Sequence, residues 1–192
     1  MDYRAFKLVN GLAGHSLDGL FSLLATDLAA VMVAIVALVF LVRWSRRREA
    51  RRAGALLGTI SAALALTAVQ PLSHAIARMR PYAAHPEHAH LLIARSADYS
   101  FPSDHAVGAF ALAFGIWLYD RTLGSVLLIL AATLSLSRVV VGTHYPGDVL
   151  AGALIGAAVP AVLFAVPATR RPLERLAERA GGWCDRVITR RA

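Results

Sequence analysis

Long apolar stretches alternate with short polar segments along most of the chain. Four stretches are long enough, or nearly so, for a helix to cross roughly 30 Å of hydrocarbon. They lie at about 25–42, 53–72, 123–141 and 147–167. A fifth, at about 104–119, has a shorter apolar core between clear polar boundaries. The pattern predicts an all-α, polytopic membrane bundle with about five transmembrane spans.

A short amphipathic segment precedes the first apolar stretch. Residues 3–13 place Tyr3, Phe6 and Val9 at spacings that suit a helix lying at the membrane interface. The first apolar run is followed by Arg43, whereas a secretory signal would have a cleavage site of small residues there. We therefore expect an N-terminal interfacial helix and a first span that is retained.

Composition supports this interpretation. Hydrophobic residues make up 57% of the 192 positions and charged residues only 17%, which is too apolar for an ordinary soluble domain. The formal net charge is +8; 19 of the 20 basic residues are arginine, and 13 of these lie in two blocks beside apolar runs. Membrane topology explains such blocks better than nucleic-acid binding, so we expect no nucleic-acid partner.

The two arginine blocks predict the orientation of the chain. One lies at 43–52 and the other at 170–191. With five spans both fall on one side, which the positive-inside rule makes cytoplasmic, so that 73–103 and 138–147 face outward. We expect a membrane domain at 1–168 and a basic amphipathic tail at 169–192, in a bacterial inner (plasma) membrane whose extracytoplasmic face carries the polar clusters.

Two polar clusters fall at predicted outward ends of spans in the first half of the chain. In Arg78-Met79-Arg80-Pro81-Tyr82, the proline disfavours helix at Arg80, so both guanidinium groups can leave the helix. In Phe101-Pro102-Ser103-Asp104-His105, Ser103 is a natural N-cap. The helix end above it offers free amides to an anion.

A third cluster contains Ser137-Arg138, His144 and Asp148. Pro146 suits the start of a helix, which would place His144 and Asp148 about one turn apart. A carboxylate in that position could hold one imidazole nitrogen and leave the other free to attack an electrophile.

Each cluster alone also has an ordinary explanation. Arginine at a membrane boundary commonly snorkels to headgroups, Pro-Ser-Asp is a common helix cap, and a single interfacial histidine is usually solvated. Together, however, they bring three arginines, two histidines and an aspartate to one side of one bundle. Because charges beside lipid are costly, the combination indicates a phosphate-binding site.

These motifs resemble those of a known family. Arg80-Pro81, Pro102-Ser103-Asp104-His105 and Ser137-Arg138-x5-His144-x3-Asp148 are similar, in order and spacing, to the three signature motifs of the type 2 phosphatidic acid phosphatase superfamily. The resemblance implies a helical lipid phosphatase that needs neither metal nor cofactor and forms a phosphohistidine intermediate.

Residue roles follow from the resemblance by matched position. It implies that His144 attacks phosphorus and that Asp148 orients and stabilises it. His105 would protonate the departing oxygen and then activate water. Phosphate oxygens would be bound by Arg80, Arg138 and Ser103.

Two positions depart from the family pattern. Ser73 stands where the family usually has lysine, and Asp104 where it usually has glycine. Both variants resemble the undecaprenyl-diphosphatase branch associated with bacitracin resistance. Arg78 is our candidate to replace the missing lysine as a phosphate ligand, while Asp104 suggests no role beyond capping its helix.

The sequence thus predicts a phosphatase that converts undecaprenyl (polyprenyl) diphosphate to the monophosphate and inorganic phosphate. Its partners would be that lipid substrate and the bilayer. Alternatives are a phosphatase for phosphatidylglycerophosphate, phosphatidate or a phosphorylated lipid-linked sugar, or a non-catalytic lipid transporter or binding subunit. The histidines of the 85–90 loop are expected to form a polar surface, and no metal site is expected.

Overall fold

A computed structural model describes residues 2–14, 16–41 and 47–189. All of its regular elements are helical in these ranges, which confirms the predicted all-α class. They are α1 (Asp2–Asn10), α2 (Asp18–Thr26), α3 (Leu28–Leu41), α4 (Arg48–Ile76), α5 (Pro81–Ala84), α6 (Asp104–Trp117), α7 (Arg121–Val140), α8 (Pro146–Ala165) and α9 (Pro167–Thr189).

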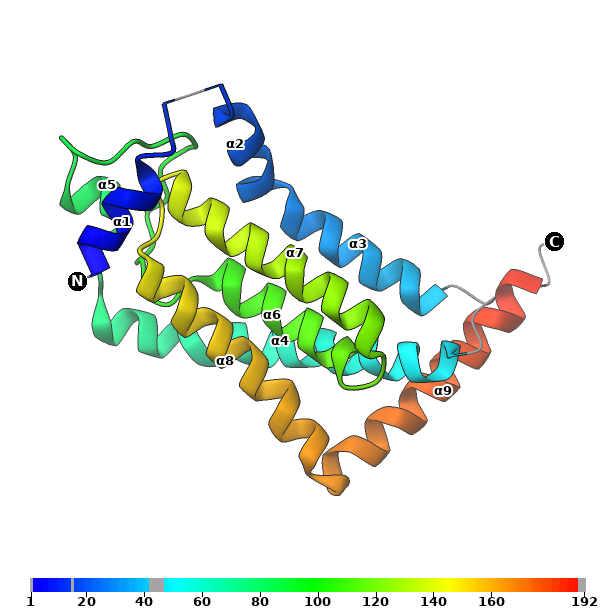
Figure 1. The fold of residues 1–192 in the computed structure, drawn as a ribbon. Helices are drawn as coiled ribbons and strands as arrows, with labels where there is room; N and C mark the ends of the chain where they lie inside the picture. Colours follow the sequence, from blue (N-terminus) through cyan, green and yellow to red (C-terminus); the bar gives the residue numbers. More distant parts are fainter. Residues whose placement is uncertain (1, 15, 42–46, 190–192) are drawn as a thin grey trace.

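The centre of the bundle is α6, which packs against α4, α7 and α8 (Figure 1). Small residues allow these helices to approach closely, as is common between helices in membranes. A Cβ atom on Gly115 of α6 would lie only 2.4 Å from the Cα atom of Gly58 of α4. Glycine at this crossing therefore brings the two helices that flank the site into backbone contact.

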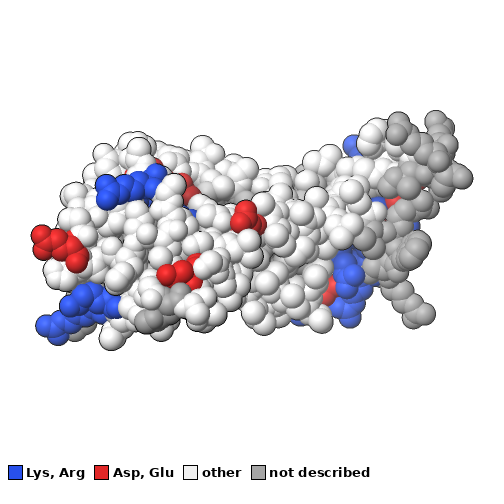
Figure 2. Space-filling view, turned by 90° about the horizontal axis from the view of Figure 1, so that it is seen from above, with Lys and Arg blue, Asp and Glu red and all other residues white. Residues whose placement is uncertain are grey.

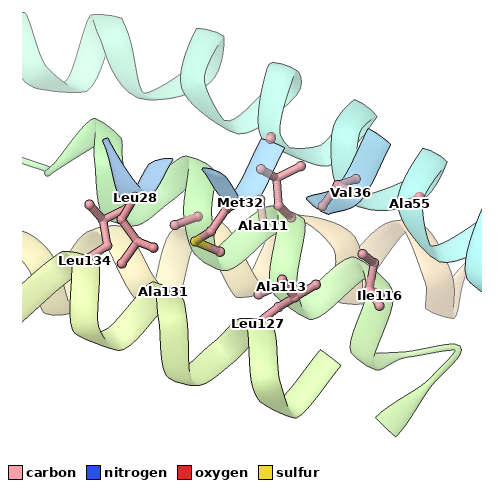
Figure 3. Close-up of a cluster of buried hydrophobic side chains, with 13 residues drawn as sticks. Leu28, Met32, Val36, Ala55, Ala111, Ala113, Ile116, Leu127, Ala131 and Leu134 are labelled. Carbon is pink, nitrogen blue, oxygen red and sulfur yellow. The ribbon is translucent and has the colours of Figure 1, made fainter. Parts of the chain in front are cut away.

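Apolar side chains from four helices, α3, α4, α6 and α7, fill the largest buried cluster (Figure 3). On α3, Leu28, Met32 and Val36 recur every fourth residue and face inward. They meet side chains of α6 and α7, among which Leu127 and Leu134 are fully buried. This layer fixes α3 beside the central helix.

By a strict criterion of helix length and composition, the structure has fewer membrane spans than the sequence predicted. Within the described residues, three stretches are long and apolar enough to cross a membrane, namely Arg48–Ala84, Arg121–Val140 and Pro146–Ala165. The predicted span at 25–42 is instead a pair, α2 and α3, bent by 47°, which could count as a fourth. The predicted span at 104–119 is the 14-residue helix α6, only about 21 Å long. The expected five spans are therefore not established by helix length.

The described parts of the two arginine blocks and the three polar clusters found in the sequence lie at opposite ends of the bundle. The start of α4 and the helix α9 share one end, while α1, α5 and the 85–103 segment share the other (Figure 1). Lys and Arg on the face in Figure 2 likewise lie towards the two ends and not over the middle. Four arginines of the predicted blocks, Arg43, Arg46, Arg190 and Arg191, lie outside the described residues.

The C-terminal segment is docked against the bundle. The predicted boundary between 168 and 169 falls inside the first turn of α9. Arg52 of α4 is fully buried and donates two hydrogen bonds, of 3.0 and 2.7 Å, to the carboxylate of Asp185 in α9. Its Nε atom also donates to the carbonyl of Phe40, at 2.8 Å. One arginine thus joins α3, α4 and α9.

Candidate active site

A polar cavity of about 340 Å³ lies at the end of the bundle that carries α1, α5 and the 85–103 segment, beside α4, α6 and α7. Four residues singled out from the sequence line it together: Arg80, His105, Arg138 and His144. They come from the three separate sequence motifs, so the fold brings the motifs into one site. The volume suits a small polar group such as a phosphate or diphosphate.

His144 lies in the short turn between α7 and α8 and is almost completely buried. Its Nδ1 atom lies 2.8 Å from the carbonyl oxygen of Ser100, which can only accept a hydrogen bond. Its Nε2 atom lies 3.1 Å from Nη1 of Arg80, which can only donate. In the neutral ring the proton is therefore on Nδ1 and the lone pair is on Nε2.

Burial lowers the pKa of His144 most strongly. The Asp148 carboxylate raises this pKa, whereas the guanidinium groups of Arg80 and Arg138 lower it. The net effect is a pKa below the ordinary histidine value. His144 is therefore kept neutral, which is the form that can act as a nucleophile.

Asp148 does not hold the imidazole directly. Its carboxylate lies 3.8 Å from Nδ1 of His144, beyond hydrogen-bond distance. It accepts hydrogen bonds from the backbone N–H of Tyr145, at 2.8 Å, and from the hydroxyl of Ser100. Since the carbonyl of Ser100 binds His144, the carboxylate is connected to the imidazole through this serine.

Arg80 is held rigidly by acceptors on two loops. It donates to the backbone carbonyl and the side chain of Asp98, at 3.1 and 2.9 Å, and to the carbonyl of Thr143, at 3.0 Å. Burial raises the pKa of Asp98, but hydrogen bonds from Ser96 and the charge of Arg80 outweigh this and hold it below the ordinary value. Arg80 thus faces an ionised carboxylate on one side and His144 on the other.

Arg138 is buried and less fully satisfied. One terminal nitrogen donates to the carbonyl of Ala25, next to the break between α2 and α3, at 3.0 Å. Its Nε atom has no hydrogen-bond partner among the described residues. Because an unpaired buried donor is costly, an anion in this cavity would relieve the deficit.

Two predicted phosphate ligands lie outside the cavity lining. Ser103 is fully buried at the start of α6, and its hydroxyl has no partner in the described part of the chain. The guanidinium group of Arg78 is engaged by two carboxylates, those of Asp148 and Asp2, each at 2.6 Å. Arg78 is therefore not among the residues that line the cavity, where the sequence suggested that it replaces the missing lysine as a phosphate ligand.

Several contributing residues were missed by the sequence analysis. Ser100 and Asp98 lie just before the second motif, and Thr143 lies just before His144. Their adjacency to motif residues was the only available signal. Asp2 was not assigned to the site, because it lies 76 residues before Arg78 in the sequence.

An apolar groove of about 860 Å³ adjoins the polar cavity. It lies between α3, α4 and α6, and it shares the residues Gln70, Asp104 and His105 with the polar cavity. Along α4 it extends from Gln70 to Ala55, a distance of about 22 Å at 1.5 Å per residue. The site therefore combines a charged pocket with a long hydrocarbon-lined channel.

Comparisons with known proteins agree with the motifs. Residues 52–172 match the PAP2 superfamily model. The chain is 34% identical to undecaprenyl-diphosphatase of Bacillus subtilis, over 85% of this chain and 82% of that protein. It is also 34% identical to a putative undecaprenyl-diphosphatase of Escherichia coli, over 69% and 67% of the two chains.

A solved structure shares the fold. The crystal structure of LpxE from Aquifex aeolicus superposes with a TM-score of 0.65 and 25% sequence identity, covering 84% of this chain and 93% of that one. The resemblance inferred from three motifs is thus confirmed across most of the chain. This protein belongs to the PAP2 superfamily and is a membrane lipid phosphatase.

Proposed function

We propose that the protein hydrolyses a polyprenyl diphosphate, with undecaprenyl diphosphate as the leading candidate, to the monophosphate and inorganic phosphate. The observation that carries this proposal is the lone pair of His144 Nε2 beside Arg80, in a cavity that also holds His105 and Arg138. Relatives named as undecaprenyl-diphosphatases match over most of the chain and support the choice of substrate.

In the first step, His144 Nε2 attacks the terminal phosphorus. The bond from that phosphorus to the bridging oxygen breaks, and His105 supplies a proton to the departing lipid monophosphate. Arg80, whose Nη1 atom donates to Nε2 in this structure, shifts that hydrogen bond to a phosphoryl oxygen. Arg138 brings its unpaired donor to the same phosphoryl group as charge builds.

In the second step, water cleaves the phosphohistidine. His105, now neutral, takes a proton from the water as its oxygen bonds to phosphorus. The P–N bond breaks, and inorganic phosphate and neutral His144 are formed. No step requires a metal ion, since the proposed charge stabilisation comes from arginine.

The apolar groove supports a long, single-chain lipid tail. With standard carbon–carbon bond lengths, a five-carbon unit spans roughly 5 Å, so a groove of about 22 Å accommodates about four units. We infer that the groove holds the first units of the tail and leaves the rest in the bilayer.

We further propose that the site faces the extracytoplasmic side of a bacterial inner membrane. The arginines at the start of α4 and along α9 lie at the opposite end, as the positive-inside rule requires for a cytoplasmic end. In this orientation α6 is a short fifth span inside the bundle. The helix α1 and the turn after it, with Leu8 and Leu12 exposed, lie at the outer interface.

A lipid phosphate monoester is the second candidate substrate. The charge of the cavity favours this candidate, because Asp98 partly neutralises Arg80. A cavity with less net positive charge suits the smaller charge of a monoester.

Phosphate release from purified protein in detergent separates these candidates. Undecaprenyl diphosphate, phosphatidylglycerophosphate and phosphatidate are compared at equal mole fraction, with and without EDTA. We expect the highest kcat/KM on the diphosphate and no loss with EDTA. Higher kcat/KM on a monoester would reject the diphosphate assignment, and loss of activity restored by one divalent ion would reject the metal-free mechanism.

A further inference from the structure

We propose that Arg78 and Asp2 are positioning residues that hold Asp148 and, through Ser100, the His144 imidazole, so that α1 belongs to the catalytic apparatus. This inference rests on the proposed function of the same site. It assigns Arg78 a role other than phosphate binding.

Arg78 supports the nucleophile through both its side chain and its backbone. Its Nη1 atom donates to Oδ1 of the fully buried Asp148, at 2.6 Å. Its carbonyl accepts a hydrogen bond from the backbone N–H of Ser100, at 2.8 Å. Ser100 in turn donates through its hydroxyl to Asp148 and accepts from His144 Nδ1. Every group that orients the imidazole from the Nδ1 side therefore contacts Arg78 or a direct partner of Arg78.

Asp2 holds the other side of the Arg78 guanidinium group. Its Oδ2 atom accepts from Nη2 of Arg78, at 2.6 Å, and its Oδ1 atom accepts from the backbone N–H of Gly147, at 2.9 Å. The guanidinium group also stacks on the ring of Tyr145, at 4.0 Å. Asp2 thus ties Arg78 to the first turn of α8, the same turn that carries Asp148.

The helix that carries Asp2 is fixed independently of this contact. Phe6 of α1 is fully buried and packs edge-on against Tyr145, with ring centroids 5.5 Å apart. Asn10 donates to the carbonyls of Val140 and His90, at 2.7 and 2.8 Å. Neutralising Asp2 should therefore leave α1 in place and disturb only the position of Arg78.

The competing role, phosphate binding by Arg78, makes different predictions. If Arg78 binds phosphate, its removal should raise KM, more for a diphosphate than for a monoester. A lysine at position 73, inside the cavity, should then restore binding. If Arg78 is a positioning residue, its removal should lower kcat equally for both substrates, and the lysine at position 73 should not restore it. Under the positioning role Asp2→Asn should also lower kcat for both substrates, whereas under the phosphate-binding role it should change KM.

The test compares kcat and KM of Asp2→Asn, Arg78→Gln, their double variant, and Arg78→Gln combined with Ser73→Lys. We expect about a tenfold or larger fall in kcat for each single variant, with KM within about twofold, because the nucleophile is misaligned while the phosphate ligands remain. The double variant should be no slower than Arg78→Gln, since the two residues act as one unit. Arg78→Lys, which keeps the charge but reaches only one carboxylate, should recover part of the loss.

Two controls separate this effect from misfolding. Arg4→Gln alters an exposed charge on the same helix and should leave kcat unchanged. Gly147→Ala places a Cβ atom 2.8 Å from Oδ2 of Asp2, so it should displace that side chain and reproduce the Asp2→Asn defect without removing a polar group.

Wild-type kcat in both Asp2→Asn and Gly147→Ala would overturn the proposal, as would rescue of Arg78→Gln by Ser73→Lys. Failure of the proposed substrate assignment is distinguishable, because wild-type protein would then prefer a monoester. The same variants measured on that monoester should still show the kcat pattern described above.

Discussion

At the residue scale, the two nitrogens of His144 meet groups of opposite character. A backbone carbonyl receives the Nδ1 proton and an arginine donates towards Nε2, so a single tautomer satisfies both contacts. The nitrogen that carries the lone pair, which we propose to be the attacking atom, is therefore defined by the fold and not by substrate binding. Asp148 contributes through Ser100, which makes the hydroxyl of Ser100 as important to orientation as the carboxylate.

The lowered pKa of His144 predicts the acidic limb of the pH profile. The proposed attack by His144 needs the neutral ring, so kcat/KM should be maintained as the pH falls and decline only below the ordinary histidine value of about 6.5. The measurement is kcat/KM from pH 4.5 to 9, with the ionisation of the substrate followed separately by ³¹P chemical shift. A midpoint above about 6.5 that the substrate does not explain would contradict the buried, neutral nucleophile.

Motif spacing predicted four of the residues that share the cavity but not how they are connected. His105, Arg80, Arg138 and His144 meet as expected. The hydrogen bond expected between Asp148 and His144 is replaced by one through Ser100, 48 positions away from Asp148 in sequence. Residue types and local spacing cannot reveal such a contact, because it depends on how the loop before α6 folds against the start of α8.

At the element scale, the apolar stretches of the sequence predicted the positions of the helices well but their lengths less well. The break between α2 and α3 at Asp27 has no proline or glycine to signal it. It coincides with Ala25, whose carbonyl accepts a hydrogen bond from Arg138, so a tertiary contact accompanies the bend. The shortness of α6 reflects the turn at Leu118–Tyr119, which leads into the Asp120 cap of α7.

The docking of α9 predicts a stability effect far from the site. Asp185→Asn would leave the buried Arg52 charge with only the partly exposed Glu49 carboxylate, 3.7 Å away, and should lower the free energy of unfolding by roughly 3 kcal/mol. The exposed Glu178→Gln on the same helix is the matched control. Thermal unfolding in detergent measures both. Equal midpoints for the two variants would show that α9 is not anchored by this ion pair.

The groove between α3, α4 and α6 predicts a dependence on tail length. Gly108→Leu adds bulk inside the groove one turn below His105 and should raise KM for a long-chain substrate by about tenfold. A short-chain, water-soluble substrate should be unaffected. Leu154→Phe, on the exposed face of α8, is the control and should change neither value. Equal KM increases for both substrates would mean that Gly108→Leu disturbs the phosphate site instead.

At the scale of the whole molecule, the distribution of arginine predicts sidedness. Cys184, in α9, is the chain's single cysteine and provides a built-in probe. A membrane-impermeant thiol reagent should label it in inverted vesicles but not in intact cells. Glu87→Cys in a Cys184→Ser background, with the new thiol in the exposed loop at the other end, should show the reverse. Labelling of Cys184 in intact cells would place the active site in the cytoplasm.

The most direct test of the central claim is to trap the phosphoenzyme. Protein is mixed with lipid diphosphate labelled with ³²P at the terminal phosphate, denatured within milliseconds, and assayed for acid-labile, alkali-stable label. We predict label on His144, greater accumulation in His105→Asn, where hydrolysis of the intermediate is slowed, and none in His144→Asn. A His144→Asn protein that still turns over, or that carries the same label on another residue, would contradict the account.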